Sequence, residues 1–161
     1  MKKIKKSVLF ICADQWRFDC FSFLNHQYAL TPNLDKLAKK SVIFKSHFAG
    51  IVPCGPSRTT MLTGLYPFIH RSVYNGAPLD KRFTNIAKEA RKLDYNPSLY
   101  GYTDTSWDPR YLDPKDEKNF TYESPMEGFD DGCVLPGGKP EPWANHLNQN
   151  GFEINKAEYF Y

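Results

Sequence analysis

The chain has 161 residues, of which 21 are basic and 18 acidic, for a formal net charge of +3, and 41% are hydrophobic. This length corresponds to about one domain, and the hydrophobic content excludes a disordered charged tail. The weak charge does not indicate a nucleic-acid partner, no apolar run reaches the roughly 18 residues of a membrane span, and four cysteines are too few for a disulfide scaffold. We therefore expect a globular, cytoplasmic protein with no membrane partner.

The N-terminus has two interpretations. Residues 1–6 are basic and residues 7–13 are mostly apolar, which is the order of a secretory signal, but the apolar stretch is short and no small-x-small cleavage site follows it. Residues 8–12 are rich in β-branched and aromatic side chains, which favours a buried strand that ends at Asp14. We favour the strand, and this interpretation places Cys12 in the core.

Helices and further strands then alternate along the chain. Helices are predicted from Pro32, from Pro56 to Gly64 and after Thr84, and strands over 42–44 and 98–102. Thr31 and Thr84 are the predicted N-caps of the first and third of these helices. This alternation predicts an α/β fold with a mostly parallel sheet flanked by helices.

Residues 103–142 show no helical or strand period. Six of the twelve prolines lie between Pro109 and Pro142, and the aromatic residues of this stretch argue against plain disorder. We expect an ordered, packed loop, followed by a short helix over 143–150 that ends at Gly151. The aromatic end at 159–161 has no polar tail, so we interpret the chain as an interrupted domain.

The segment from Cys54 to Gly64 is CGPSRTTMLTG. It resembles the sulfatase signature, Cys-x-Pro-x-Arg followed by Leu-Thr-Gly. In that family a maturation enzyme recognises the cysteine, proline and arginine, here Cys54, Pro56 and Arg58. It oxidises the cysteine to Cα-formylglycine. The resemblance implies a metal-dependent hydrolase with an alkaline-phosphatase-like α/β fold, of which residues 1–161 form the N-terminal part, with the irregular loop at about 103–142.

Local chemistry agrees with this resemblance. A helix that begins at Pro56 directs unpaired backbone N–H groups and the positive end of its dipole toward Cys54, which suits a sulfate or phosphate group. The hydrated aldehyde has one hydroxyl that attacks sulfur or phosphorus and a second that later expels the product. Arg58 adds fixed positive charge. Without the surrounding signature, Cys54 would be interpreted as a small buried thiol.

The resemblance also implies metal ligands at Asp14 and Gln15, with Cys54 as a third. Asp14 follows the first predicted strand, at the edge of the sheet where ligands of open α/β sheets bind. Carboxylate and amide oxygens suit a hard dication, so we expect Ca²⁺, with Mn²⁺ or Mg²⁺ as alternatives. These three residues do not complete a six-coordinate site. The family supplies further metal ligands, and a His and a Lys, later in the sequence.

The segment Gly101-Tyr102-Thr103 resembles the phosphonate monoester hydrolase and phosphodiesterase branch of the family. That resemblance implies substrate-binding roles for Asn75 and Tyr102. The alternatives without a substrate contact are a turn at Asn75-Gly76 and, for Tyr102, an aromatic side chain in the core or at the rim of the pocket. Asp104 stands where that branch commonly has a threonine, so the resemblance assigns it no contact. His70 follows the signature helix closely enough to approach the site.

Two functional classes follow. The first is a formylglycine-dependent and metal-dependent hydrolase of sulfate esters or phosphonate/phosphate esters, with a small-molecule ester and a formylglycine-generating or other sulfatase-maturation enzyme as partners. The second is a non-catalytic truncated or split-gene fragment that binds anions or a complementary chain. Assembly into a homo-oligomer stays open in both.

Overall fold

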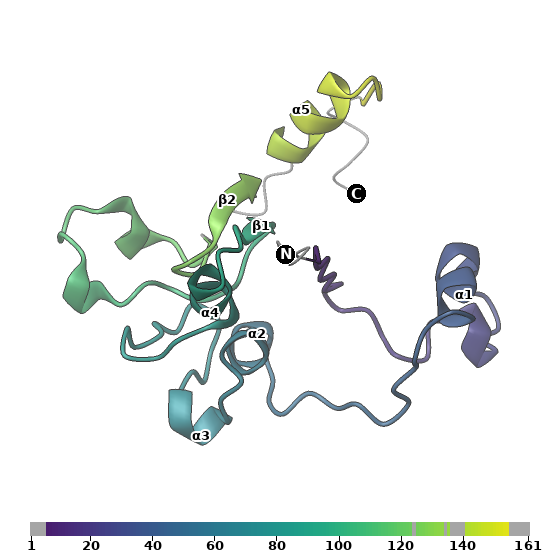
Figure 1. Cartoon of the computed structure of the whole chain (residues 1–161), viewed down its shortest axis with the longest axis horizontal. Helices are drawn as coiled ribbons and strands as arrows, with labels where there is room; N and C mark the ends of the chain where they lie inside the picture. Colours follow the sequence, from purple (N-terminus) through teal and green to yellow (C-terminus); the bar gives the residue numbers. More distant parts are fainter. Residues whose placement is uncertain (1–5, 124, 134, 136–140, 155–161) are drawn as a thin grey trace, which may run out of the picture. The chain divides into compact units, whose positions relative to one another are not determined.

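The computed structural model describes residues 6–123, 125–133, 135 and 141–154 (Figure 1). The chain divides into two compact units, Met1–Phe48 and Ala49–Tyr161. The first unit contains the 3-10 helix η1 (Ser22–Leu24) and helix α1 (Pro32–Ala38). The second contains the remaining helices and the two strands of the described residues. Each helix in the described part of the chain is too short or too polar for a membrane span.

Helix α1 begins at Pro32 as predicted, but Thr31 does not cap it. The Thr31 hydroxyl accepts the backbone N–H of Ser22 at 3.0 Å, and the helix has no side-chain cap. The Ser22 hydroxyl in turn donates to the Asp35 carboxylate at 2.7–2.8 Å. Thr31 is thus used to attach η1 to α1, because its single hydroxyl is already engaged by a residue nine positions away.

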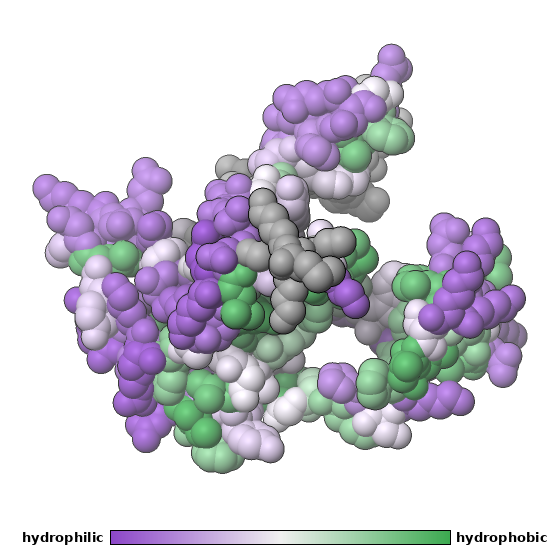
Figure 2. Space-filling view, viewed as in Figure 1, coloured by the Kyte–Doolittle hydropathy of each residue, from purple (hydrophilic) through white to green (hydrophobic). Residues whose placement is uncertain are grey.

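The strands predicted over 8–12 and 42–44 are wrong. Neither segment has strand structure. Hydrophobic residues lie at the surface of the first unit (Figure 2). Val8 is 84% exposed and Phe44 73%. Cys12 is exposed as well, so it is not a core residue. A strand requires a neighbouring strand to pair its backbone groups. The described part of the first unit contains no such neighbour.

Helix α2 (Cys54–Thr63) ends at Gly64, as predicted, but it begins two residues before Pro56. Gly64 takes the left-handed conformation that closes a helix, with φ of 70°. Helix α3 (Pro67–His70) follows, and α2 contacts both α3 and α4 (Ile86–Lys92).

The N-cap of α4 is Asn85 rather than the predicted Thr84. The Asn85 side chain accepts the backbone N–H groups of Ala87 and Lys88, both at 3.0 Å. Thr84 donates its hydroxyl to Glu89 instead. Thr and Asn are both common N-cap residues, and here they are adjacent in the sequence. The tertiary structure therefore decides which of the two caps α4.

The sheet pairs β1 (Ser98–Tyr100) with β2 (Asp130–Cys133) in parallel. This confirms the α/β prediction and shortens the strand expected over 98–102. It also corrects the interpretation of 103–142, because β2 lies inside that stretch. Its composition, Asp-Asp-Gly-Cys, has no strand propensity of its own, so pairing with β1 decides its structure.

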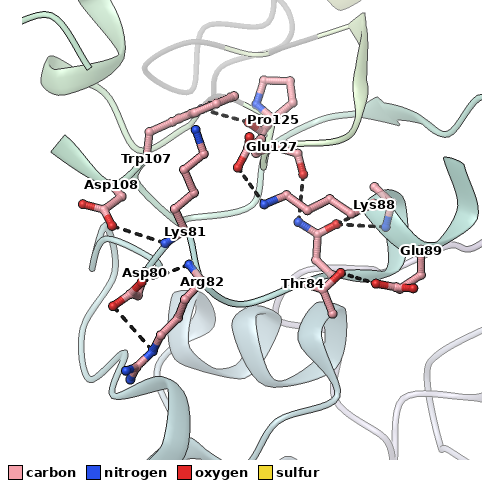
Figure 3. A network of polar contacts seen from close by, with 12 residues as sticks. Asp80, Lys81, Arg82, Thr84, Lys88, Glu89, Trp107, Asp108, Pro125 and Glu127 are labelled. Atoms are coloured by element: carbon pink, nitrogen blue, oxygen red, sulfur yellow. Dashed lines mark hydrogen bonds and ion pairs between the residues drawn. The ribbon is translucent and has the colours of Figure 1, made fainter. Parts of the chain in front are cut away.

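Among its described residues, the stretch 103–142 also contains the 3-10 helices η2 (Pro109–Tyr111) and η3 (Glu117–Phe120), and residues 127–128 contact α4. Lys88 of α4 pairs with Glu127 at 2.7 Å, and Trp107 donates its indole N–H to the Pro125 carbonyl at 3.1 Å (Figure 3). These contacts attach Glu127 to α4 and Trp107 to the backbone at Pro125.

Asp108 is a second anchor of this loop. It is buried and accepts the backbone N–H of Lys81 at 3.2 Å (Figure 3) and two bonds from the Arg110 guanidinium at 2.9 and 2.6 Å. The hydrogen bonds from Arg110 hold the pKa of this carboxyl far below its usual range. The backbone after β1 is therefore fixed in place, close to the residues expected in the site.

The hydrophobic core of the second unit joins α2 to this loop. It consists of Leu62, Leu79 and Met126, with Phe83 and Phe129 packed against them. Helix α5 (Glu141–Gln149) follows, two residues earlier than predicted, and Gly151 lies just beyond it with φ of 84°.

Candidate active site

Cys54 is the first residue of α2 and is partly buried. Pro53 precedes it in an extended conformation, so the chain turns into the helix at Cys54 itself. The first backbone N–H groups of an α-helix have no partner within the helix, and they lie at its positive end. One of them, Gly55 N–H, is bound by the side-chain oxygen of Asn75 at 2.8 Å. The first turn of α2 therefore brings Cys54 and Asn75 into one neighbourhood.

Gly55 allows this close approach. A methyl group at this position would lie 2.6 Å from the Asp104 carbonyl oxygen and 3.0 Å from the Asn75 Cα. The same Asp104 carbonyl accepts the backbone N–H of Gly76 at 2.8 Å. The loop at 75–76 and the backbone at 104 thus pack directly against the start of α2, with no room for a side chain between them.

Arg58 lies one turn after Cys54 on the same helix. Its Nη1 donates to Asp104 Oδ2 at 2.9 Å, and the two side chains are only 11% and 8% exposed. The guanidinium carbon lies 4.3 Å from the centre of the Tyr102 ring, which is a cation–π contact. Of the residues predicted for the site, Cys54, Arg58, Asn75 and Tyr102 therefore gather around the first turns of α2.

Asp104 is the residue that sequence reasoning missed. It takes a left-handed conformation, with φ of 55°, which Asp adopts more readily than most residues. The signal was present, since an acidic residue interrupts a run of threonines at 103–105, but its partner lies 46 positions away. Behind this pair, the hydroxyls of Thr59 and Thr105 lie 3.1 Å apart and are buried.

His70 is the last residue of α3, and its side chain contacts Thr60 of α2. Its Nδ1 accepts the backbone N–H of Ser72 at 3.0 Å, so the ring hydrogen belongs on Nε2, which lies 2.9 Å from the Thr60 hydroxyl. The Thr60 hydroxyl then donates to the Pro56 carbonyl at 3.0 Å. Burial lowers the pKa of His70. His70 therefore contacts the helix through Thr60, and these bonds give it a structural position.

The proposed metal ligands belong to different units. Asp14 and Gln15 lie at an exposed turn of the first unit, where Gln15 has φ of 54°, and Cys54 lies in the second. Their carboxylate and amide oxygens fit a hard divalent ion. Within the described residues, no group of three or more His, Cys, Asp or Glu side chains is assembled that could hold a metal alone. The donor chemistry fits, and the set is incomplete.

The fold and this arrangement define an α/β protein with a cysteine at the positive end of a helix, beside a buried arginine. The sulfatase family model matches residues 6–150, so the chain belongs to the sulfatase family. It is 40% identical over 156 residues to the multifunctional alkaline phosphatase superfamily protein PehA of Trinickia caryophylli, covering 93% of this chain and 30% of the relative. It is 29% identical over 126 residues to an ulvan-active sulfatase of Formosa agariphila, covering 78% and 23%.

The solved structures give the same assignment. The phosphonate monoester hydrolase of Agrobacterium radiobacter matches with a TM-score of 0.78 and 47% identity, over 86% of this chain and 27% of that chain. The phosphonate monoester hydrolase SpPMH of Silicibacter pomeroyi matches with a TM-score of 0.67 and 46% identity, over 77% and 24%. The expected similarity to this branch is confirmed. The chain spans less than a third of the length of these relatives.

Proposed function

We propose that this chain is the N-terminal part of a hydrolase of sulfate esters or phosphonate/phosphate esters, in which Cys54 is converted to Cα-formylglycine and supplies the nucleophile. One observation carries the proposal. Cys54 begins α2, and the buried Arg58 lies one turn away against Tyr102. The family assignment and the phosphonate monoester hydrolase relatives support it.

The residues of the chain have separate roles in this proposal. The positive end of α2 and the guanidinium of Arg58 attract the anionic sulfuryl or phosphoryl group and stabilise charge that develops on its oxygens. Asn75 accepts Gly55 N–H with its oxygen, so its amide N–H groups are the donors it offers to the ester. Tyr102 holds the guanidinium plane and borders the substrate.

A divalent ion completes the proposed chemistry. Held by Asp14, Gln15 and residue 54, the ion would be Ca²⁺, with Mn²⁺ or Mg²⁺ as alternatives, and would supply positive charge beside the ester oxygens. The other partners in the proposal are a small-molecule ester and a maturation enzyme that acts on Cys54 in the cytoplasm.

The conversion of Cys54 tests the proposal directly. The chain is co-expressed with a formylglycine-generating enzyme and digested with trypsin, which releases residues 46–58 as one peptide. Replacing the thiol by an aldehyde lowers the mass of this peptide by about 18 Da. Peptides that contain Cys20 and Cys133 are internal controls and keep their mass. An unchanged mass for the Cys54 peptide contradicts the proposal.

The second candidate is a non-catalytic fragment that binds anions or a complementary chain. The exposed hydrophobic segments at 8–11 and 42–44 favour it, because such surface is typical of a missing partner. Ester hydrolysis that depends on a converted Cys54 would exclude this candidate. Binding of a complementary chain without conversion would support it.

A further inference from the structure

The buried ion pair between Arg58 and Asp104 changes the charge of the candidate site. The Nη1 to Oδ2 distance is 2.9 Å, and both side chains are about nine-tenths buried. Water screens such a pair weakly, so each charge acts on the other and on any ion bound nearby. An anion that approaches Arg58 therefore also meets a carboxylate.

The backbone fixes this carboxylate in place. Asp104 has its carbonyl bound to Gly76 N–H at 2.8 Å, and that carbonyl occupies the space that a side chain on Gly55 would need. Its φ of 55° is a conformation that few residues other than glycine, Asn and Asp adopt readily. The position of Asp104 is thus set by its contacts with the start of α2 and with Gly76.

The pair also sets the orientation of Arg58. With one nitrogen held by Asp104 and the guanidinium carbon 4.3 Å from the centre of the Tyr102 ring, the plane of the group is restrained from two directions. A lysine would lack this planar fork. Asp104 therefore has two separable effects on the site: it orients the positive charge, and it places a negative charge beside it.

We propose that Asp104 is a positioning residue that holds Arg58 against Tyr102 and makes the site select singly charged esters over doubly charged ones. This inference rests on the proposed function. A second negative charge on a ligand gains attraction from Arg58 but meets repulsion from Asp104. At an effective dielectric constant of about 20, one such carboxylate about 12 Å away disfavours each added ligand charge by about tenfold, and a closer one disfavours it more. Selection by charge follows.

Two variants separate charge from packing. Asp104→Asn keeps the side-chain size, an oxygen acceptor for Arg58 and a residue that tolerates positive φ, and it removes only the charge. Asp108→Asn is the matched control. Asp108 is also buried and belongs to the same segment, but it pairs with Arg110 at 2.6 Å.

The experiment measures binding of two probes to the 161-residue chain with its unconverted thiol. Phenylphosphonate carries two negative charges on its phosphonate group at alkaline pH. Its monomethyl ester has the same phenyl group and carries one negative charge. Calorimetry should show tighter binding of the monoester to the wild-type chain. In Asp104→Asn the ratio of the two dissociation constants should shift by at least about tenfold toward phenylphosphonate, and in Asp108→Asn it should stay at the wild-type value.

A spectroscopic readout tests the positioning role. The Arg58 Nε–Hε signal in ¹⁵N NMR should show a restrained guanidinium in the wild-type chain, and faster rotation in Asp104→Asn. A merely structural role for Asp104 would lower stability and would not change the selectivity between the probes.

Three results would overturn the inference. The first is that the wild-type chain binds the monoester no more tightly than phenylphosphonate. The second is that it binds neither probe. The third is that the ratio of the two dissociation constants is unchanged in Asp104→Asn. The first two need no variant, so they apply even if Asp104→Asn fails to fold. These measurements do not require formylglycine. An unconverted Cys54 therefore contradicts the proposed function alone, and an unchanged ratio contradicts only the role of Asp104.

Discussion

Arg58 joins the signature helix to the residues that follow β1. Its guanidinium binds Asp104 and lies over Tyr102, and both partners come from a segment more than 40 positions away in the sequence. An arginine satisfies both contacts because its charged group is planar and its N–H groups point in fixed directions. The same geometry suits the binding of two oxygens of a sulfuryl or phosphoryl group.

Arg58→Lys should therefore reduce catalysis even where maturation succeeds. Lysine keeps the charge but loses the planar group, and loss of one preorganised donor costs about 10²–10³ in turnover. The measurement, made on the full-length hydrolase, is turnover of a phosphonate monoester per mole of formylglycine, with the aldehyde quantified by mass spectrometry. Arg91→Lys is the control, because Arg91 pairs with the exposed Asp130. A normalised turnover within a few-fold of wild type would limit Arg58 to maturation.

Gly55→Ala should destabilise the second unit. The added methyl group would lie 2.6 Å from the Asp104 carbonyl, so the start of α2 must move away from 75 and 104. Such overpacking costs about 1–3 kcal/mol. Gly50→Ala is the matched control, since its nearest neighbour would be the Thr60 methyl group at 3.9 Å. Urea denaturation of both variants measures the difference, and equal midpoints would refute the close approach.

At the scale of elements, the start of α4 depends on one side chain. Asn85 caps the helix through Ala87 and Lys88, and its amide nitrogen also donates to the Glu127 carbonyl at 2.8 Å. Asn85→Ala should lower the free energy of unfolding by at least about 1 kcal/mol, the usual value of an N-cap. Thr84→Ala removes only an exposed contact and should change it less. A larger loss in Thr84→Ala would restore Thr84 as the cap.

The connection between α3 and α2 should make stability depend on pH. Burial lowers the pKa of His70, so the unfolded chain binds the proton more readily than the folded chain does. The contribution of His70 to the free energy of unfolding should be fully present above its unfolded pKa of about 6.5 and should decline as the pH falls below that value. Asp108 contributes only in a much more acidic range, because its pKa is far below normal.

Urea midpoints at neutral pH and at about pH 5.5 measure this decline. The decline should be weaker in His70→Gln, which cannot gain the proton. His47→Gln is the control, because His47 is exposed. A decline of equal size in His70→Gln would assign the effect to another group.

At the scale of the whole molecule, the two units differ in how their hydrophobic residues are used. The second unit buries Leu62, Leu79 and Met126 in a common core, whereas the first has none of its described residues fully buried. Hydrogen exchange followed by mass spectrometry should therefore show rapid exchange over 8–12 and 42–44, and protection over α2 and α4. Strong protection over 8–12 would indicate a strand there after all.

Several features followed from the sequence because they depend on neighbouring residues. Pro32 and Gly64 predicted a helix start and a helix end, since a proline fits the first turn and a glycine adopts the left-handed end. The spacing of Cys54, Pro56 and Arg58 indicated the family, and the match to the sulfatase family model confirmed it. Features of this kind are local, and the sequence alone determined them.

The tertiary structure decided what depends on distant residues. Val8 and Phe44 have strand-forming neighbours in sequence but no pairing partner among the described residues of their unit, whereas Asp130–Cys133 forms β2 against its own propensity because β1 is adjacent. Asp104 acquired its place beside Arg58 in the same way. Backbone pairing and burial of a charge both require a specific partner, and only the folded chain determines which partner is close enough.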